Sequence, residues 1–245
     1  MPTTVYWASF PSTHSDLQVS ELKYFEPISV LKELNAPVFF GPNASKCPAI
    51  VDEAKNTFKI KSPLDLNITF NENFNRFTSK YSHDINFLQH MIGPFGEDKV
   101  VQLAAPTYLF FCEESLLMTQ LPPYYEETDF TKSCINLSAT FDIGKWFRVI
   151  KPSFKIRQGV QTIDIKLGDA LAYLKFNTEE KINLVRFDAS TFYKENQDII
   201  GNLLSFKFHK KNPFIPTKLS EGYDAFLRAR YNKRVLKIIK ENLLE

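Results

Sequence analysis

Glycine is scarce in this chain, with 8 residues among 245. Enzymes that cradle phosphate groups use glycine-rich loops, because glycine lets the backbone approach the phosphate closely. The nucleotide-binding patterns G-x-x-x-x-G-K-S/T and G-x-G-x-x-G are absent, and so are G-x-S-x-G and H-E-x-x-H. These absences exclude the common signatures of nucleotide-binding proteins, serine hydrolases and zinc proteases, although they leave other enzyme classes open.

Cysteines and long apolar runs are also scarce. The three cysteines, Cys47, Cys112 and Cys134, form no C-x-x-C pair, which argues against a disulfide framework and a structural zinc site. Apolar runs such as Tyr108–Cys112 are too short to cross a bilayer, and Met1–Trp7 lacks the basic and apolar segments of a secretory signal. The sequence therefore predicts a cytoplasmic protein with buried free thiols and no membrane partner.

The overall composition is typical of a globular protein, with 44% hydrophobic residues, 24% charged residues and a formal net charge of +2. The charge is nevertheless unevenly distributed. Residues 206–245 contain ten Lys or Arg and four Asp or Glu, whereas residues 1–205 contain twenty and twenty-four. A mildly acidic body is therefore followed by a basic C-terminal segment.

Alternating residues and short apolar runs dominate the middle of the chain and predict strands. Ile163–Leu167 alternates, and the turn residues Gly168-Asp169 join it to the apolar run Ala170–Phe176, which predicts a hairpin. The other predicted strands are Phe58–Lys61, Leu64–Phe70, Val100–Ala104, Tyr108–Cys112, Leu116–Gln120, Ile135–Phe141 and Phe154–Arg157. We predict a mainly β fold, β-sandwich or jelly-roll-like, whose core holds many of the 23 phenylalanines.

Helices are predicted near the two ends of the chain. Pro27 and Pro48 each fit the first position of a short N-terminal helix, one running to about Leu34 and the other to Lys55. Leu219–Leu244 contains no proline and one glycine, and it predicts the longest helix. The chain is therefore divided into a mainly β body with helical caps over residues 1–187 and a helical C-terminal extension over residues 188–245.

The predicted C-terminal helix carries apolar residues on two sides. At about 100° per residue, the apolar residues between 219 and 227 share one side, and those between 231 and 243 lie roughly opposite. A straight helix cannot bury both groups against one flat surface. The helix would therefore wrap around the body, kink, or place one half against another chain, and we expect the last two together.

His83, Asp84 and His90 form the densest group of metal-ligating residue types. Two histidines and one carboxylate that converge form the facial triad of non-haem iron enzymes. Because His83 and Asp84 are adjacent, they would point to opposite faces of a strand, although they could converge within a loop. Two alternatives stay open, a metal-dependent jelly-roll enzyme that uses these residues and a polar surface loop. No cofactor is predicted.

Cys47 is a candidate nucleophile because it precedes Pro48 at a predicted helix start, where the helix dipole favours a thiolate. Nucleophilic catalysis would also need a nearby base, such as His83 or His90. Cys112 and Cys134 lie within apolar segments, so we predict that they are core residues.

Two pairs of adjacent acids, Glu113-Glu114 and Glu126-Glu127, contain the carboxylates that glycoside hydrolysis or metal binding would need. No spacing rule connects the two pairs. Because adjacent acids are common in solvated turns, the loop interpretation is favoured for both.

The segment Pro122-Pro123-Tyr124-Tyr125 matches the P-P-x-Y pattern that WW domains bind. Inside a β domain, a pair of prolines more often forms a rigid loop between strands. The loop is therefore the favoured interpretation.

The basic C-terminal segment is the best candidate for an interaction surface. Its basic residues could neutralise nucleic-acid phosphates, contact an acidic surface on a neighbouring subunit, or simply be solvated. The predicted interaction residues are Lys210, Lys211, Arg230, Lys233, Arg234, Lys237 and Lys240.

Four short segments, Cys47-Pro48, Lys61–Leu66, Phe141–Arg148 and Ile165–Leu171, follow one another in a distinctive order. This order resembles that of an uncharacterised family of domains found in phage and bacterial genomes, over about residues 45–187. The resemblance implies a compact, mainly β domain of viral, bacteriophage type, located in a host cytoplasm or a virion. It implies no catalytic residues.

The missing catalytic motifs, the two apolar faces and the basic tail lead to three functional hypotheses. The leading one is a non-enzymatic phage-type assembly or interaction module that binds a protein partner or associates with itself. One alternative is a metal-dependent jelly-roll enzyme that uses His83, Asp84 and His90. The other is nucleic-acid binding through the basic C-terminal helix.

Overall fold

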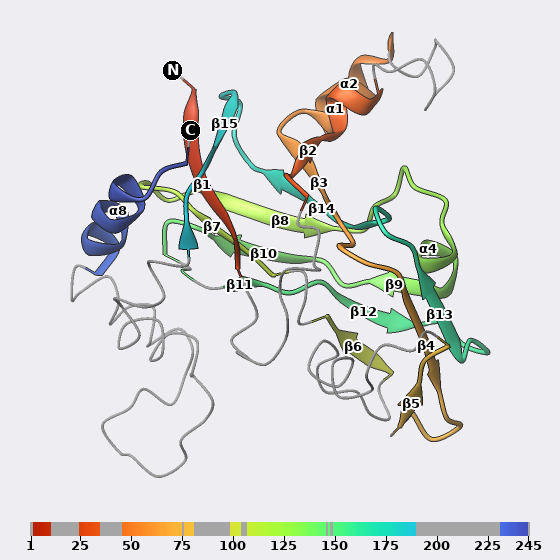
Figure 1. The fold of residues 1–245 in the computed structure, drawn as a ribbon. Helices are drawn as coiled ribbons and strands as arrows, with labels where there is room; N and C mark the ends of the chain where they lie inside the picture. The colour runs from red at the N-terminus through yellow and green to blue at the C-terminus, as the bar shows by residue number, and fades with distance from the viewer. Residues whose placement is uncertain are drawn as a thin grey trace.

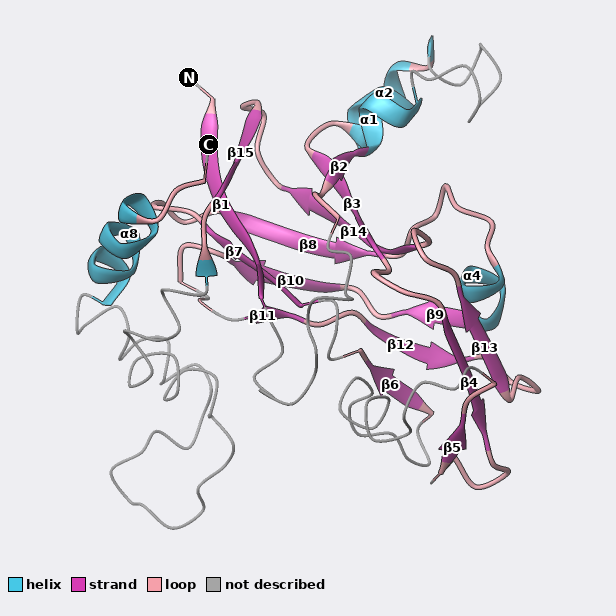
Figure 2. Cartoon of the chain, viewed as in Figure 1, coloured by secondary structure: helices cyan, strands magenta, loops and turns pink. Residues whose placement is uncertain are grey.

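The structure is a computed structural model that describes residues 2–10, 25–34, 46–74, 76–80, 99–103, 107–145, 147, 149–189 and 231–244. These residues form a mainly β structure with short helices at its periphery (Figure 2). The predicted fold class is confirmed, because the strands assemble into several sheets in a sandwich-like arrangement.

Two larger sheets form the centre of the structure (Figure 1). Sheet A has the order β11 (Val149–Ile150), β7 (Thr107–Phe111), β1 (Thr3–Phe10) and β15 (Ile182–Arg186), with β15 parallel to β1 and the other pairs antiparallel. Sheet B is antiparallel, with the order β10 (Ala139–Asp142), β8 (Leu117–Leu121), β14 (Ala170–Phe176), β3 (Thr57–Lys61) and β2 (Ile28–Ser29).

Two three-stranded sheets and four helices complete the described fold. One sheet has the order β6 (Val100–Gln102), β12 (Ser153–Ile156) and β9 (Cys134–Asn136), and the other has β13 (Thr162–Ile165), β4 (Leu66–Phe70) and β5 (Phe77–Thr78). The described helices are α1 (Val30–Leu34), α2 (Pro48–Ala54), α4 (Asp129–Ser133) and α8 (Tyr231–Glu241).

Sheet A is buried on both faces, because alternate side chains of its strand β1 enter two different apolar clusters. Val5 and Trp7 of β1 enter the main core, whereas Tyr6 and Ala8 enter a second apolar cluster on the opposite face. The main core also contains residues of sheet B and of both small sheets, such as Phe176. Seven of the ten largest fully buried side chains are phenylalanines, so the prediction of a phenylalanine-rich core is confirmed.

The predicted hairpin at Gly168-Asp169 is wrong in its pairing, although the turn is present. Gly168 has a φ of 89°, a left-handed value that glycine adopts without strain. The two flanking strands, however, belong to different sheets: β13 pairs with β4, whereas β14 pairs with β3 and β8. Each strand finds its partners far away in the sequence, so local turn chemistry cannot predict them.

The segment predicted as one strand, Ile135–Phe141, divides into β9 and β10. β9 pairs with β12, and β10 pairs with β8. Between them, the Leu137 N–H donates to Ser153 at 2.9 Å, and the Leu137 carbonyl accepts from Gln120 at 3.3 Å. The segment therefore passes from one sheet to the next at Leu137-Ser138.

The turn after β10 is organised by the Asp142 carboxylate. This carboxylate accepts from the Ser115 hydroxyl at 2.6 Å and from the backbone N–H groups of Leu116 and Gly144, and it pairs with Lys145 at 2.9 Å. Burial raises the pKa of Asp142, but the hydrogen bonds from Ser115 and Lys145, together with the Lys145 charge, outweigh burial and lower the pKa overall.

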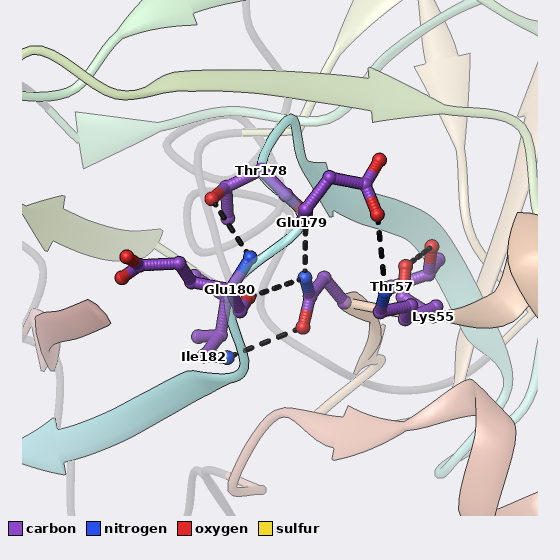
Figure 3. Close-up of polar contacts among 7 residues, drawn as sticks. Lys55, Thr57, Thr178, Glu179, Glu180 and Ile182 are labelled. Carbon is purple, nitrogen blue, oxygen red and sulfur yellow. Dashed lines mark hydrogen bonds and ion pairs between the residues drawn. The ribbon is translucent and has the colours of Figure 1, made fainter. Parts of the chain in front are cut away.

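Asn56 joins sheet B to sheet A where the chain leaves β14 and enters β15. Its side-chain amide donates to the Thr178 and Glu180 carbonyls at 2.8 and 2.7 Å, and its side-chain oxygen accepts from the Ile182 N–H at 3.2 Å. These three partners lie together at the junction, beside the Lys55–Glu179 ion pair (Figure 3). Asn56 has a φ of 55°, which asparagine tolerates better than most residues.

The predicted helices are only partly confirmed. α2 matches the predicted Pro48 helix within one residue. In the segment predicted as a helix from Pro27, the first residues pair with β3 as β2, so α1 begins only at Val30. In the predicted C-terminal helix, α8 accounts for Tyr231–Glu241. The proposed boundary at residue 187 stays a prediction.

Candidate functional site

The C-terminal helix α8 is attached to the outer face of sheet A by its apolar side (Figure 1). Val235 and Ile239 are fully buried there, and they form one cluster with Leu109, Phe111 and Phe187 of the body. Of the apolar side predicted between residues 231 and 243, Val235, Ile238 and Ile239 are thus buried within the chain, whereas Leu243 is exposed. The second predicted apolar side, residues 219–227, lies outside the described residues, and so does the predicted kink.

The chain after α8 fixes the end of this helix to the edge of sheet A. The Leu244 N–H donates to the Arg186 carbonyl at 3.0 Å, and the Asp188 N–H donates to the Asn242 carbonyl at 2.8 Å. This antiparallel bridge follows β15 directly. Because α8 is held both by its apolar side and at its end, its orientation on the body is fixed.

The burial of one side of α8 turns its basic residues outward. At about 100° per residue, Lys233, Lys237 and Lys240 lie opposite Val235, and Arg234 borders this group. All four basic side chains belong to exposed residues. We call Lys233, Arg234, Lys237 and Lys240 the basic face of α8. It contains four of the seven predicted interaction residues.

Among the residues that the structure describes, acidic side chains pair with only part of the basic face. Lys237 pairs with Glu241 at 3.8 Å, and Lys240 pairs with Glu113 at 3.4 Å. Both are exposed surface pairs, which contribute about 0–1 kcal/mol to stability. Within the described ranges, Lys233 and Arg234 have no acidic partner.

A second concentration of charge lies on the outer face of sheet B. Lys59 of β3 is only 3% exposed, and its Nζ atom contacts Glu33 Oε2 of α1 at 2.5 Å and Glu126 Oε1 of the loop after β8 at 2.9 Å. The Tyr173 hydroxyl donates to the same Glu126 oxygen at 3.3 Å. We call Lys59, Glu33, Glu126 and Tyr173 the Lys59 cluster. It connects α1 and the loop to the sheet beneath them.

Three tyrosines pack beside the Lys59 cluster. The ring of Tyr124 lies 4.6 Å from that of Tyr125 and 5.1 Å from that of Tyr173, both edge-on. Burial, followed by the charge of Glu126, raises the pKa of Tyr173, and burial, followed by the charge of Glu53, raises those of Tyr124 and Tyr125. The three hydroxyls therefore stay protonated, and those of Tyr124 and Tyr173 donate hydrogen bonds to Glu53 and Glu126.

The Pro122-Pro123-Tyr124-Tyr125 segment forms a turn, as the loop interpretation predicts. The Tyr124 N–H donates to the Pro122 carbonyl and the Glu126 N–H donates to the Pro123 carbonyl, both at 2.9 Å. A WW domain reads an extended polyproline II segment, so this folded turn does not present the motif in the form that such a domain binds.

The cysteines differ in their surroundings. Cys112 and Cys134 are buried in the main core, which confirms that prediction. Burial raises the pKa of both thiols, that of Cys134 to about 12. Cys47 is half-buried and occupies the N-cap of α2. All four histidines lie outside the described residues, so the pairing of Cys47 with a histidine base stays a prediction.

The two glutamate pairs lie at opposite ends of β8 and do not form one site. Glu113-Glu114 precedes β8, both residues are exposed, and Glu113 pairs with Lys240 of α8. Glu126 follows β8 and contacts Lys59, whereas Glu127 is exposed and pairs with Lys132 at 3.2 Å. The solvated-loop interpretation fits Glu113, Glu114 and Glu127. Glu126 instead belongs to a buried ion cluster.

Several predicted site residues cannot be placed. His83, Asp84, His90, Lys210, Lys211 and Arg230 lie outside the described residues. Within the part of the chain that the structure describes, no three His, Cys, Asp or Glu side chains come together as metal ligands. In that same part, no helix is long and apolar enough to cross a membrane.

Comparisons with known proteins find no match among protein-family models, curated proteins or solved structures. The resemblance to a phage and bacterial domain family therefore stays a prediction.

Proposed function

We propose that this chain is a non-enzymatic β-sandwich interaction module, and that the basic face of α8 docks on an acidic surface of a protein partner. The observation that supports the proposal is the arrangement of α8. Its apolar side packs against sheet A, and its exposed side carries four basic residues and one acidic residue. A helix that is fixed on a rigid sheet presents these charges with little loss of entropy on binding.

The acids that border this face favour a protein partner over nucleic acid. Glu113 is exposed and pairs with Lys240 near the end of α8, and Glu241 lies on the helix itself. A polyphosphate backbone would be repelled by these carboxylates, whereas a protein surface of mixed charge can place its own cations against them. Nucleic-acid binding through the basic helix is the alternative, and the experiment must distinguish it from binding to a protein partner.

The test compares two variants that each reverse one lysine and one arginine. The double variant K233E/R234E changes the basic face, and K155E/R157E changes two exposed residues at and after β12. The probe is a fluorescent peptide rich in glutamate and aspartate, followed by anisotropy. We expect K233E/R234E to weaken peptide binding about tenfold, because exposed charge pairs contribute up to about 1 kcal/mol each. K155E/R157E should bind as the parent protein does.

Equal affinities of the two variants, or no binding of the peptide to the parent protein, would contradict the proposal. Labelled duplex DNA and single-stranded RNA are titrated in parallel over a series of salt concentrations. Tighter binding to either nucleic acid, with a steep salt dependence that K233E/R234E abolishes, would replace the protein partner by a nucleic acid.

Other parts of the functional hypothesis rest on the sequence. A phage origin, an assembly or host-interaction role, and a location in a host cytoplasm or virion are supported by the family resemblance. The metal-dependent alternative needs His83, Asp84 and His90 to converge. Elemental analysis after reconstitution with iron tests it, and purified protein that retains no transition metal would contradict it.

A further inference from the structure

The sheet of β6, β12 and β9 carries exposed apolar and basic residues side by side on its outer face. Its inward side chains, such as that of Cys134, belong to the main core. Because side chains alternate along a strand, the residues between them point outward. Four of these outward residues, at or just after β9 and β12, are exposed. We call Ile135, Leu137, Lys155 and Arg157 the Ile135 face.

The register of the two strands places the four residues next to one another. Lys155 lies directly opposite Ile135. Two backbone hydrogen bonds extend this register past the ends of the strands, from the Leu137 N–H to the Ser153 carbonyl at 2.9 Å and from the Arg157 N–H to the Ser133 carbonyl at 3.0 Å. The Ile135 face therefore consists of an apolar row on one strand and a basic row on the neighbouring strand, about 4.8 Å away.

The Ile135 face is open to water. Ile135 is 46% exposed and Leu137 is 37% exposed. Within the described ranges, no acidic side chain pairs with Lys155 or Arg157. The outer faces of the two larger sheets differ, because α8 packs on sheet A, and α1 and α2 pack on sheet B. Helices are thus the elements that cover outward apolar residues of a sheet elsewhere in this chain.

The chemistry of the Ile135 face disfavours two other occupants. If a second copy of the same face packed on it, Lys155 and Arg157 would meet like charges, which repel. Single-stranded nucleic acid stacks its bases on aromatic rings, and the four residues of the Ile135 face contain no aromatic ring. A ligand that fits must supply both apolar side chains and carboxylates.

We propose that the Ile135 face binds an acidic amphipathic helix of a partner protein. Two apolar residues one turn apart on a helix are about 6 Å apart along its axis, close to the roughly 7 Å between Ile135 and Leu137 expected for alternate residues of a strand. Glutamates three residues after each apolar residue lie beside that apolar row, where they pair with Lys155 and Arg157. This surface goes beyond the proposed function, because it lies away from α8 (Figure 1).

The test uses a fluorescent, alanine-based helical peptide, followed by anisotropy. The peptide carries two leucines four residues apart and a glutamate three residues after each leucine. We expect I135T/L137T and K155E/R157E each to weaken binding at least about tenfold, through lost apolar contact and reversed charge respectively. K233E/R234E is the matched control and should bind the peptide as the parent protein does. The two face variants change exposed residues, and threonine suits a strand, so their urea unfolding should match that of the parent protein.

Unchanged affinity in either face variant, or weakening by K233E/R234E alone, overturns the proposal. Vesicles of phosphatidylserine and phosphatidylcholine, and sedimentation velocity of the parent protein alone, test the other occupants. Vesicle binding without peptide binding, if both face variants abolish it, would replace the helix by an anionic lipid surface. Association of the parent protein that I135T/L137T abolishes would replace the helix by a second copy.

The two proposals can fail separately. The glutamate- and aspartate-rich peptide that tests the basic face of α8 lacks the apolar residues that Ile135 and Leu137 contact, so K155E/R157E stays a suitable control for that peptide. Loss of leucine-peptide binding in the two face variants, with no effect of K233E/R234E on either peptide, supports the Ile135 face and contradicts the proposed function. The reverse pattern supports the proposed function and contradicts the Ile135 face.

Discussion

Replacement of Lys59 by methionine should destabilise the protein strongly. The Lys59 side chain is 4% exposed and those of its partners Glu33 and Glu126 are 22% and 12% exposed, so the substitution leaves two carboxylates close together with little access to water. The removal of one partner from a buried ion pair costs about 3–5 kcal/mol. At about 2–4 °C per kcal/mol for a chain of this size, the melting temperature should fall by roughly 10 °C.

The assays are urea unfolding and thermal unfolding, each followed by circular dichroism, with Lys175→Met as the matched control. Lys175 is on the neighbouring strand β14 and pairs with Glu53 at 2.6 Å, but its side chain is 25% exposed and that of Glu53 is 47% exposed. Its removal should cost about 1 kcal/mol or less.

A triple variant tests whether the uncompensated charge is the cause. K59M/E33Q/E126Q replaces both carboxylates by neutral amides and keeps an oxygen for the Tyr173 hydroxyl. It should recover at least half of the stability lost in K59M, because no buried charge is left unpaired. A K59M protein as stable as K175M, or a triple variant no more stable than K59M, would refute the reasoning.

Three further predictions concern the turns that join the sheets. Gly144→Ala places a Cβ atom 2.2 Å from the Glu114 carbonyl oxygen and should cost about 2 kcal/mol in urea unfolding. Gly159→Ala meets no atom within 4 Å and should cost about 1 kcal/mol through its positive φ, so equal losses would contradict the packing argument. Because the folded-state pKa of Asp142 is lowered from 3.8, its stabilising contribution is present above that pH and is lost as the pH falls through the folded-state pKa. In thermal unfolding, the Asp142→Asn variant should not show this loss of stability at low pH. Parallel curves of melting temperature against pH for the parent protein and the variant would contradict this prediction. Asn56→Ala removes three hydrogen bonds and should cost about 1–3 kcal/mol in urea unfolding, whereas unchanged stability would show that the junction does not need them.

Local patterns predicted many of the strands. β3, β4, β12 and β13 lie within one or two residues of predicted alternating segments, because alternation indicates one buried face directly. β7, β8 and β14 lie within one residue of predicted apolar runs. β1 is not among the predicted strands. Its residues Val5–Ala8 are all buried, since one face of sheet A meets the main core and the other meets the cluster that includes α8. A continuous apolar run of this kind does not distinguish a strand from a buried helix.

The candidate site could be predicted only in part. The basic face was accessible from the sequence, because helical periodicity separates Lys233, Lys237 and Lys240 from the apolar side of α8. The Lys59 cluster could not be predicted from the sequence. In the sequence Phe58-Lys59-Ile60-Lys61, Lys59 occupies a position that looks solvent-facing, and nothing local indicates that Glu33 and Glu126 will cover it. Burial of this residue depends on contacts with segments 26 and 67 residues away.

The most direct test of the central claim is a map of backbone amide shifts in the ¹⁵N-labelled protein during titration with the acidic peptide. We predict that the largest shifts occur at α8, around Lys233 and Arg234, and that they disappear at high salt. Shifts that concentrate elsewhere on the body, or that leave α8 unchanged at saturation, would contradict the claim that the exposed face of this helix is the binding surface.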